Sequence, residues 1–226
     1  MTKGIFITGT DTGVGKTLAA CALLRAFAQR GEWVVGMKPV AAGTQPIDGE
    51  SINPDVSALR AASNVAAPLA SMNPYSFAPP VAPHIAAQQA GVTIELGNIV
   101  RAYRDLAARA DRIVVEGAGG ALVPLNRHDD MLDIARSLAL PVVLVVGLRL
   151  GCLNHALLSA LAIRMRGLRL AGWIASAIDP ALAQSEENVA SLVERLAAPC
   201  LAVAPFLPAP VDATGFTLRS DALAIL

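Results

Sequence analysis

A glycine-rich segment between an apolar run and a helix-forming stretch constrains this chain more than any other feature. Residues 9–17 read GTDTGVGKT; they follow the apolar residues 4–8 and lead into a helix predicted over residues 16–30. Where a strand is followed by a glycine-rich turn and then by the start of a helix, the backbone N–H groups of the turn and the positive end of the helix converge on an anion. Lys16 would then reach the β- and γ-phosphates of a nucleotide, and the hydroxyl of Thr17 would bind Mg2+.

This segment is a variant of the standard phosphate-binding loop. Gly9 lies one residue further from Gly15 and Lys16 than is usual, and Thr10 takes its place. A glycine turn that only joins a strand to a helix is the alternative, and the Gly-Lys-Thr ending argues against it. A dinucleotide-binding fold is disfavoured because no Gly-x-Gly-x-x-Gly follows a predicted strand.

Short β-branched runs alternate with longer alanine- and leucine-rich stretches, a pattern typical of a parallel sheet flanked by helices. We predict strands at residues 4–8, 33–38, 112–116, 142–147, 170–175 and 201–204. Helices are predicted at residues 16–30, 93–109, 131–138, 153–166 and 185–196. The expected fold class is α/β, with one domain over residues 1–226 and a central, mostly parallel sheet that carries helices on both faces.

Residues 41–89 interrupt this alternation and are rich in Pro, Asn and Ser. They could form a linker between two domains or a long functional excursion from one domain. We favour the excursion, because neither flank is long enough to build a separate core and long loops in compact domains are usually functional.

Composition narrows the range of partners. The net charge is zero, aromatic residues make up 4% of the chain, and no run of Lys or Arg occurs, so the electrostatic signature of a nucleic-acid or membrane-surface binder is missing. Cys21, Cys152 and Cys200 are odd in number and widely spaced, which argues against disulfides or a zinc site. With neither a signal peptide nor a segment long enough to cross a bilayer, we expect a cytoplasmic protein that binds small ligands.

Glu116 is a candidate metal ligand. It follows the apolar residues 113–115 and precedes the glycine-rich residues 117–120. A carboxylate at the carboxyl end of a strand can hold a metal ion beside a phosphate loop, and glycines let backbone approach a ligand. Capping of the next segment is the alternative. Spacing alone does not rank the other candidate carboxylates, Asp11, Asp48 and Asp55.

Lys38 ends the strand predicted at residues 33–38. A lone lysine there is more often a solvated surface residue, but ligands of such sheets gather at the carboxyl ends of strands, which makes Lys38 a candidate second cation for a phosphate.

The residues considered so far predict Mg-nucleotide binding with phosphoryl transfer. Two classes of protein remain open: an enzyme, either a synthetase or a kinase, and a nucleotide-switched ATPase. Partitioning-type switches carry a lysine where this chain has Thr12, which favours the enzyme.

Seven segments occur together in an order that is more specific than any one of them. They are GTDTxVGKT at residues 9–17, KPVA at 38–41, NPYxF at 73–77, PxxPH at 80–84, VEGAGG at 115–120, LGCLNHA at 150–156 and GW at 172–173. With these segments the chain resembles the dethiobiotin synthetase family along nearly its whole length.

The resemblance implies an ATP-dependent ligase that works as a homodimer with Mg2+. In that family, diaminopelargonic acid takes up CO2 as a carbamate, the carbamate attacks the γ-phosphate of ATP, and the neighbouring amine closes a cyclic urea and expels phosphate. Carried onto matching positions, the catalytic residues would be Lys16, Lys38 and Thr12, with the two lysines stabilising charge on the phosphoryl group. The implied metal ligands are Thr17, Asp55 and Glu116.

Two larger groups of residues follow from the same resemblance. The implied nucleotide-binding residues are Gly13, Val14, Gly15, Lys16, Thr17, Leu18, Asp55, Glu116, Gly117, Ala118, Gly119, Ser176, Ala177, Pro205, Phe206 and Leu207. The implied substrate-binding residues are Lys38, Ala42, Gly119, Gly151, Cys152, Leu153 and Asn154. The last four would come from the partner subunit, where the amide groups of a helix start would receive the substrate carboxylate.

Two positions depart from the family pattern. Ala42 stands where family members commonly have a serine that touches the substrate, and losing that hydrogen bond would weaken binding by roughly 1 kcal/mol. Ser176 stands where an asparagine usually reads the adenine edge, which predicts a relaxed preference among nucleoside triphosphates. The other interpretations are an amidation synthetase of the same superfamily and a non-enzymatic ATP switch.

Overall fold

The computed structural model describes residues 4–47, 49–207, 218–219 and 221–226. A six-stranded sheet in the order β10-β9-β8-β1-β7-β2 forms its centre, and every neighbouring pair in this sheet is parallel. Its strands are β1 (Gly4–Gly9), β2 (Val34–Met37), β7 (Arg112–Gly120), β8 (Val142–Leu148), β9 (Leu170–Ala177) and β10 (Cys200–Ala204).

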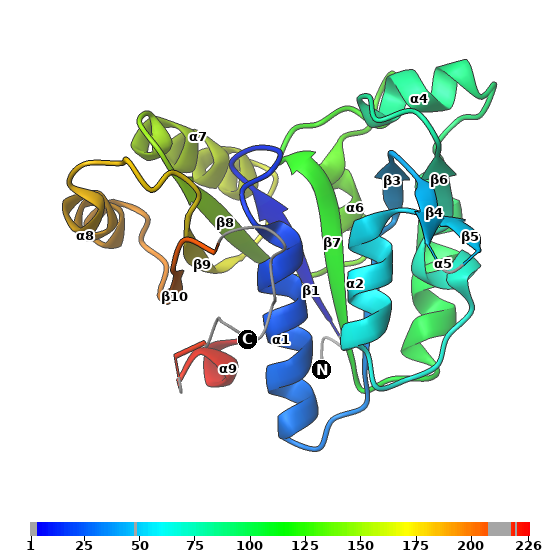
Figure 1. Cartoon of the computed structure of the whole chain (residues 1–226), viewed down its shortest axis with the longest axis horizontal. Helices are drawn as coiled ribbons and strands as arrows, with labels where there is room; N and C mark the ends of the chain where they lie inside the picture. Colours follow the sequence, from blue (N-terminus) through cyan, green and yellow to red (C-terminus); the bar gives the residue numbers. More distant parts are fainter. Residues whose placement is uncertain (1–3, 48, 208–217, 220) are drawn as a thin grey trace.

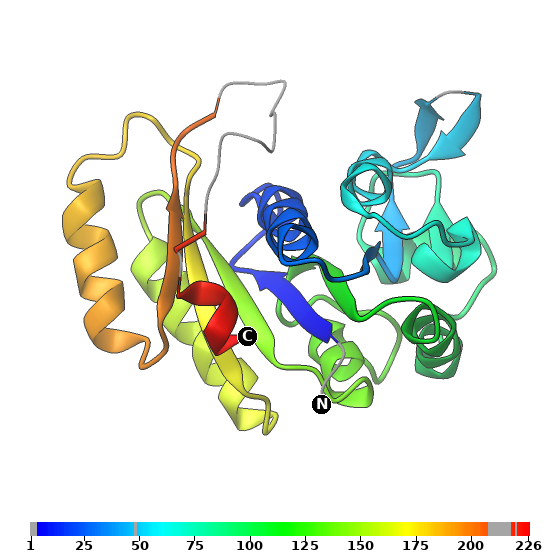
Figure 2. The same cartoon turned by 90° about the horizontal axis from the view of Figure 1, so that it is seen from below.

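Helices cover both faces of this sheet (Figures 1 and 2). The face of Ile5 and Ile7 in β1 packs against α1 (Lys16–Gln29), α2 (Pro54–Ala62) and the short α9 (Ala222–Ile225). Phe6 points to the opposite face, which is covered by α5 (Leu96–Ala107), α6 (Met131–Ser137), α7 (Cys152–Met165) and α8 (Ser185–Arg195). Because alternate residues of a strand face opposite sides, a strand covered on both faces is apolar throughout. The predicted fold class is confirmed.

The strand that carries Glu116 is longer than the sequence predicts. β7 runs on to Gly120, so Glu116 lies within the strand, opposite Ile7 of β1, and does not lie at its carboxyl end. The glycines that follow Glu116 belong to the strand, and at Gly117 a side chain would have little room: a Cβ there would lie 3.1 Å from the ring of Phe6. Elsewhere the predicted bounds are shifted by a few residues at most, as for the helix predicted from residue 93, which begins at Leu96.

Residues 41–89 are more regular than their composition indicates. β3 (Val40–Ala42) pairs in parallel with β6 (Tyr75–Phe77), and β4 (Gln45–Ile47) pairs antiparallel with β5 (Glu50–Ile52). The same segment also forms α2, α3 (Leu69–Met72) and α4 (Pro83–Gln89). Strands of three residues are too short to show an alternating pattern, which is why the sequence missed them. No helix of the described residues is long and apolar enough to cross a membrane.

Candidate active site

The phosphate loop lies between β1 and α1, where the sequence predicts it. Gly13 and Gly15 have positive φ angles of 74° and 88°, which residues with a side chain rarely adopt. Gly15 directly precedes α1, and a Cβ there would lie only 2.7 Å from Oγ of Ser176. Lys16 is buried, and its Nζ donates a hydrogen bond to the backbone oxygen of Asp11 over 2.8 Å. The glycines thus allow a tight loop that folds over its own lysine and against β9.

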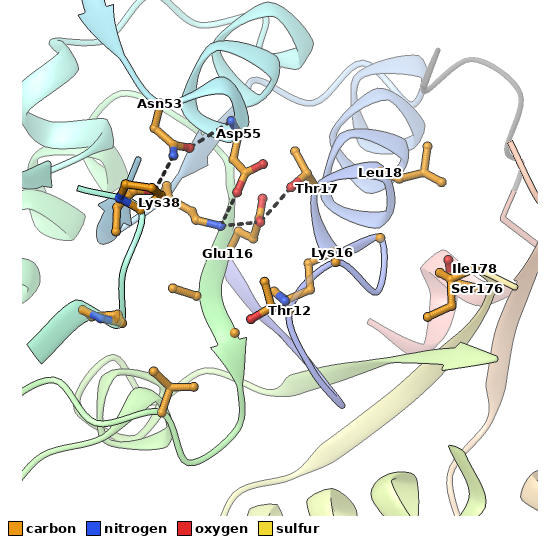
Figure 3. A pocket seen from close by; sticks show the side chains of 18 of the residues that line it. Thr12, Lys16, Thr17, Leu18, Lys38, Asn53, Asp55, Glu116, Ser176 and Ile178 are labelled. Carbon is orange, nitrogen blue, oxygen red and sulfur yellow. Dashed lines mark hydrogen bonds and ion pairs between the residues drawn. The ribbon is translucent and has the colours of Figure 1, made fainter. Parts of the chain in front are cut away.

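A cluster of charged side chains lies beside this loop (Figure 3). Nζ of Lys38 donates hydrogen bonds to Oδ2 of Asp55 (2.8 Å) and to Oε1 of Glu116 (2.6 Å). It also donates to the backbone oxygen of Gly117 over 3.2 Å. The hydroxyl of Thr17 donates to the same Oε1 of Glu116 over 2.9 Å, which joins the cluster to the first turn of α1.

Asn53, which the sequence analysis did not single out, positions Asp55. Its side-chain oxygen accepts the N–H of Asp55 over 3.0 Å and so caps α2. Its amide group donates to the backbone oxygens of Ala42 and Gly43, both 3.0 Å away, and ties the start of α2 to the end of β3. Asn53, Pro54 and Asp55 form a typical helix N-terminus, so this cap could have been predicted from the sequence.

The pKa values of the cluster follow from burial and from the pairing. Burial alone would lower the pKa of Lys38, but the carboxylates of Glu116 and Asp55 outweigh it and raise that pKa above its usual range. For Asp55, burial acts in the opposite direction and the ammonium of Lys38 outweighs it, so the pKa is lowered. Glu116 has no exposed surface, and burial raises its pKa although Lys38 opposes the shift. Lys38 is therefore held as a cation inside the protein.

Lys16 responds differently from Lys38. Burial is the main cause that lowers its pKa, the nearby charge of Lys38 adds to the effect, and the pKa falls to about 8. Its hydrogen bond goes to a neutral backbone oxygen, whereas Lys38 bonds to two carboxylates. The charge of Lys16 is therefore not paired with a hydrogen-bonded carboxylate, and it can act on an anion bound at the loop.

One cavity of about 900 Å³ brings together most residues of the predicted site. The predicted residues in its wall are Thr12, Gly13, Gly15, Lys16, Thr17, Leu18, Lys38, Ala42, Asp55, Glu116, Ala118, Gly119, Ser176, Ala177, Pro205, Phe206 and Leu207. The wall also contains residues to which the sequence gave no role, namely Asn53, Pro80, Val81, Ala82, Pro83, Val123 and Ile178. Most of these additions are apolar, so hydrophobic surface flanks the charged cluster.

Some predicted residues lie elsewhere. Val14 is buried in the core beneath the loop, and Gly117 contributes through its backbone oxygen to Lys38. Residues 151–154 begin α7, with Gly151 at a positive φ of 94°, and they do not line the cavity of their own chain. Of the further carboxylates, Asp11 pairs with Arg149, and Asp48 lies outside the described residues.

Fold and site together define a nucleotide-binding protein of the P-loop class. A family model described as an AAA domain matches residues 3–214. Two curated relatives are named ATP-dependent dethiobiotin synthetase BioD. The protein of Nitrosospira multiformis is 53% identical over 91% of this chain and 89% of its own length. That of Aromatoleum aromaticum is 52% identical over 92% of this chain and 95% of its own length. This chain belongs to the dethiobiotin synthetase family.

Solved structures show the same fold at low identity. A ParA family ATPase from Chlorobium tepidum superimposes with a TM-score of 0.54 at 13% identity, over 92% of this chain and 86% of that one. The signal recognition particle 54 kDa protein of Aeropyrum pernix gives a TM-score of 0.55 at 16% identity, over 99% of this chain and 45% of that one. These likenesses show the fold alone. The curated relatives favour the synthetase over an ATP switch or an amidation synthetase.

Proposed function

We propose that this chain closes the cyclic urea of dethiobiotin from 7,8-diaminopelargonic acid and CO2, with ATP converted to ADP and phosphate. The observation that carries the proposal is the cavity of about 900 Å³ in which a phosphate loop meets a buried lysine held by two carboxylates. Membership of the dethiobiotin synthetase family implies small-molecule substrates. A cytoplasmic location and the absence of nucleic-acid and membrane partners stay predictions.

In the proposed reaction one amine adds to CO2 and loses a proton, which gives a carbamate. A carbamate oxygen then attacks the γ-phosphorus and ADP leaves, forming a carbamic-phosphoric anhydride. The second amine attacks the carbonyl carbon, the ring closes and phosphate departs with a proton transferred from the amine. Lys16 and Lys38, which are both buried, would face the negative charge that builds during phosphoryl transfer, and a cation held in place before the reaction stabilises such charge most strongly. Thr12, in the cavity wall beside Lys16, would orient the transferred group.

The chemistry of the cluster fits Mg2+. Magnesium prefers oxygen ligands, and Thr17, Asp55 and Glu116 bring a hydroxyl and two carboxylates together. Oε2 of Glu116 is buried and has no hydrogen-bond partner, so it is free to bind a cation. No group of three or more His, Cys, Asp or Glu side chains in the described residues could hold a metal alone. Phosphate oxygens and water would complete the shell, and bound magnesium would neutralise charge on the phosphates.

Product formation tests this function. Wild-type protein supplied with Mg-ATP, diaminopelargonic acid and bicarbonate should yield a product with the mass of dethiobiotin, measured by mass spectrometry, together with equimolar phosphate. Phosphate release should require both the diamine and bicarbonate. Release that is equally fast without them, and no product of that mass, would identify a switch ATPase instead.

A homodimer is the second part of the proposal. α7 carries a row of exposed apolar side chains three to four residues apart, in which Leu158, Leu161 and Met165 are 57%, 53% and 78% exposed. Such a continuous apolar stripe on a helix is typical of a surface that another protein covers. A second copy docked on this stripe would also bring residues 151–154 of one subunit near the cavity of the other. These residues do not line the cavity of their own chain.

Leu161→Glu is expected to convert the dimer into a monomer, because each subunit would then bury a carboxylate without a charged partner in the interface. Light scattering should show the molar mass falling by half, and ligase activity should be lost while Mg-ATP binding persists. Val203→Glu on β10, where the side chain is 54% exposed, is the matched control and should stay dimeric. An unchanged mass of the Leu161→Glu variant would place the interface elsewhere.

Base selectivity is expected to be relaxed. Ser176 is buried with its Oγ against Gly15, and the neighbouring wall residues Ala177, Ile178 and Phe206 offer no side-chain donor or acceptor. Recognition of the base would then rest on apolar contact and backbone groups, which discriminate weakly. Competition binding should give dissociation constants for ATP, CTP and GTP within about tenfold of one another, and a strict preference for ATP would contradict the prediction.

A further inference from the structure

Asp11 puts a carboxylate into a loop whose proposed ligand is an anion. Its Oδ1 accepts the N–H of Thr12 over 2.7 Å, and its backbone oxygen accepts Nζ of Lys16 over 2.8 Å. Asp11 therefore shapes the loop on both sides, but its charge has the same sign as a triphosphate. The hydrogen bond from Thr12 and, after it, the guanidinium of Arg149 keep the pKa of Asp11 below its usual range, so the carboxylate stays ionised.

Arg149 provides the opposite charge. Its guanidinium donates to Oδ2 of Asp11 over 2.5 Å, across 138 residues of sequence. The two residues meet because β8 is the parallel neighbour of β1, so the loops that follow the two strands leave the same edge of the sheet. Arg149 follows β8 directly, and its backbone oxygen accepts the N–H of Cys152 in the turn that opens α7.

Neither partner of this pair lines the cavity. Asp11 and Arg149 are absent from its wall, whereas Thr12 and Lys16, which contact Asp11 through hydrogen bonds, belong to it. The side chains are 47% and 41% exposed, and an ion pair of that exposure contributes little to folding stability. Arg149 would therefore influence nucleotide binding indirectly, by its contact with Asp11.

We propose that Arg149 is a positioning residue of the nucleotide site, which cancels the charge of Asp11 and holds its carboxylate on the N–H of Thr12. This inference rests on the proposed function only in taking a nucleoside triphosphate as the ligand. Without Arg149, the Asp11 carboxylate would repel the phosphates across partly solvated protein, a like-charge interaction that weakens binding by about fivefold. The quantity that matters is the net charge of Asp11 and Arg149, which is zero in the wild type. Loss of the Arg149 charge can therefore be compensated by also removing the charge of Asp11.

The test is calorimetric titration of the full chain with Mg-ATP at low ionic strength. Arg149→Met should weaken binding by about fivefold, and this deficit should shrink at high salt. Asp11→Asn should bind at least as tightly as wild type, because its amide oxygen can still accept the Thr12 N–H while Arg149 stays. The double variant Asp11→Asn/Arg149→Met should return to within about twofold of wild type, and Arg149→Lys should bind like wild type.

Arg109→Met is the matched control, since Arg109 pairs with Asp105 far from the cavity and the two side chains are 45% and 39% exposed. It should leave Mg-ATP binding unchanged. A double variant that binds no better than Arg149→Met would overturn the proposal and point to a direct contact between Arg149 and the nucleotide. Equal binding by Arg149→Met and wild type would also overturn it. Nucleotide binding is measured without diamine, so the result can be interpreted even if the protein does not catalyse the ligase reaction. Wild-type protein that binds no nucleotide would refute the proposed function itself.

Discussion

A Lys38→Met variant is expected to lose about a hundredfold to a thousandfold in kcat, which is the usual cost of removing one preorganised charge that acts on the transition state. Affinity for Mg-ATP should change little, because bound Mg2+ would offset the charges of Asp55 and Glu116 that Lys38 balances, and Lys16 stays in the phosphate loop. Initial rates of phosphate release and titration calorimetry separate the two quantities.

Stability needs its own control in this experiment. Removing one partner of a buried ion pair costs about 3–5 kcal/mol, and Glu116 has no exposed surface that could return its carboxylate to water. Thermal unfolding should therefore be followed in Mg2+, which would replace the lost positive charge. Lys38→Arg, which keeps the charge, should be more stable than Lys38→Met but still slow, because a planar guanidinium does not fit the place of a compact ammonium. Normal turnover by Lys38→Met would remove Lys38 from the catalytic residues.

Substitution of Lys16 by Met should affect binding itself. Lys16 is the buried cation of the phosphate loop and has no carboxylate as a hydrogen-bond partner, so its removal should weaken Mg-ATP binding by about a hundredfold and abolish measurable phosphate release. Titration calorimetry and a phosphate assay measure these effects. Retained tight binding would mean that the backbone amides of the loop suffice.

The pH dependence of ATP binding provides a second measurement on Lys16. Its pKa is lowered to about 8, first by burial and then by Lys38, and the negative charge of bound phosphates would raise it again. Below pH 8 the free protein already carries the proton, whereas above pH 8 binding must take up a proton, so ATP affinity should fall as pH rises through 8. Calorimetry in buffers of different ionisation heat should detect this uptake in wild type but not in Lys16→Met. Equal uptake by both proteins would assign the proton to another group.

Local patterns predicted the parts of the fold that depend on neighbours in sequence. The phosphate loop, the strands of the main sheet and the longer helices follow from apolar runs, glycine turns and caps that lie within about twenty residues. The order of the strands does not follow from such patterns. Lys38 and Glu116 are 78 residues apart and touch because β2 and β7 are neighbours, an arrangement that the sequence alone leaves open.

The part of the site formed by residues 41–89 was predicted least well. Asp55 could not be ranked above Asp11 by spacing, yet Asn53 and Pro54 mark a helix start that places Asp55 in the first turn of α2. The apolar wall around Val81 and Val123 had no periodic signal, because single apolar residues in loops have no period, and the PxxPH motif at residues 80–84 entered only through the family resemblance.

The all-parallel sheet divides the molecule into two ends with different tolerance to change. Loops that contain charged site residues leave the carboxyl edge, whereas the turns around Gly31 and Gly167 lie at the amino edge, with open space around both glycines. Epitope tags, fluorophores or anchoring groups inserted in the turn around Gly31, which also lies away from the proposed interface on α7, would leave the reacting groups undisturbed. They would allow the protein to be immobilised or labelled while it turns over.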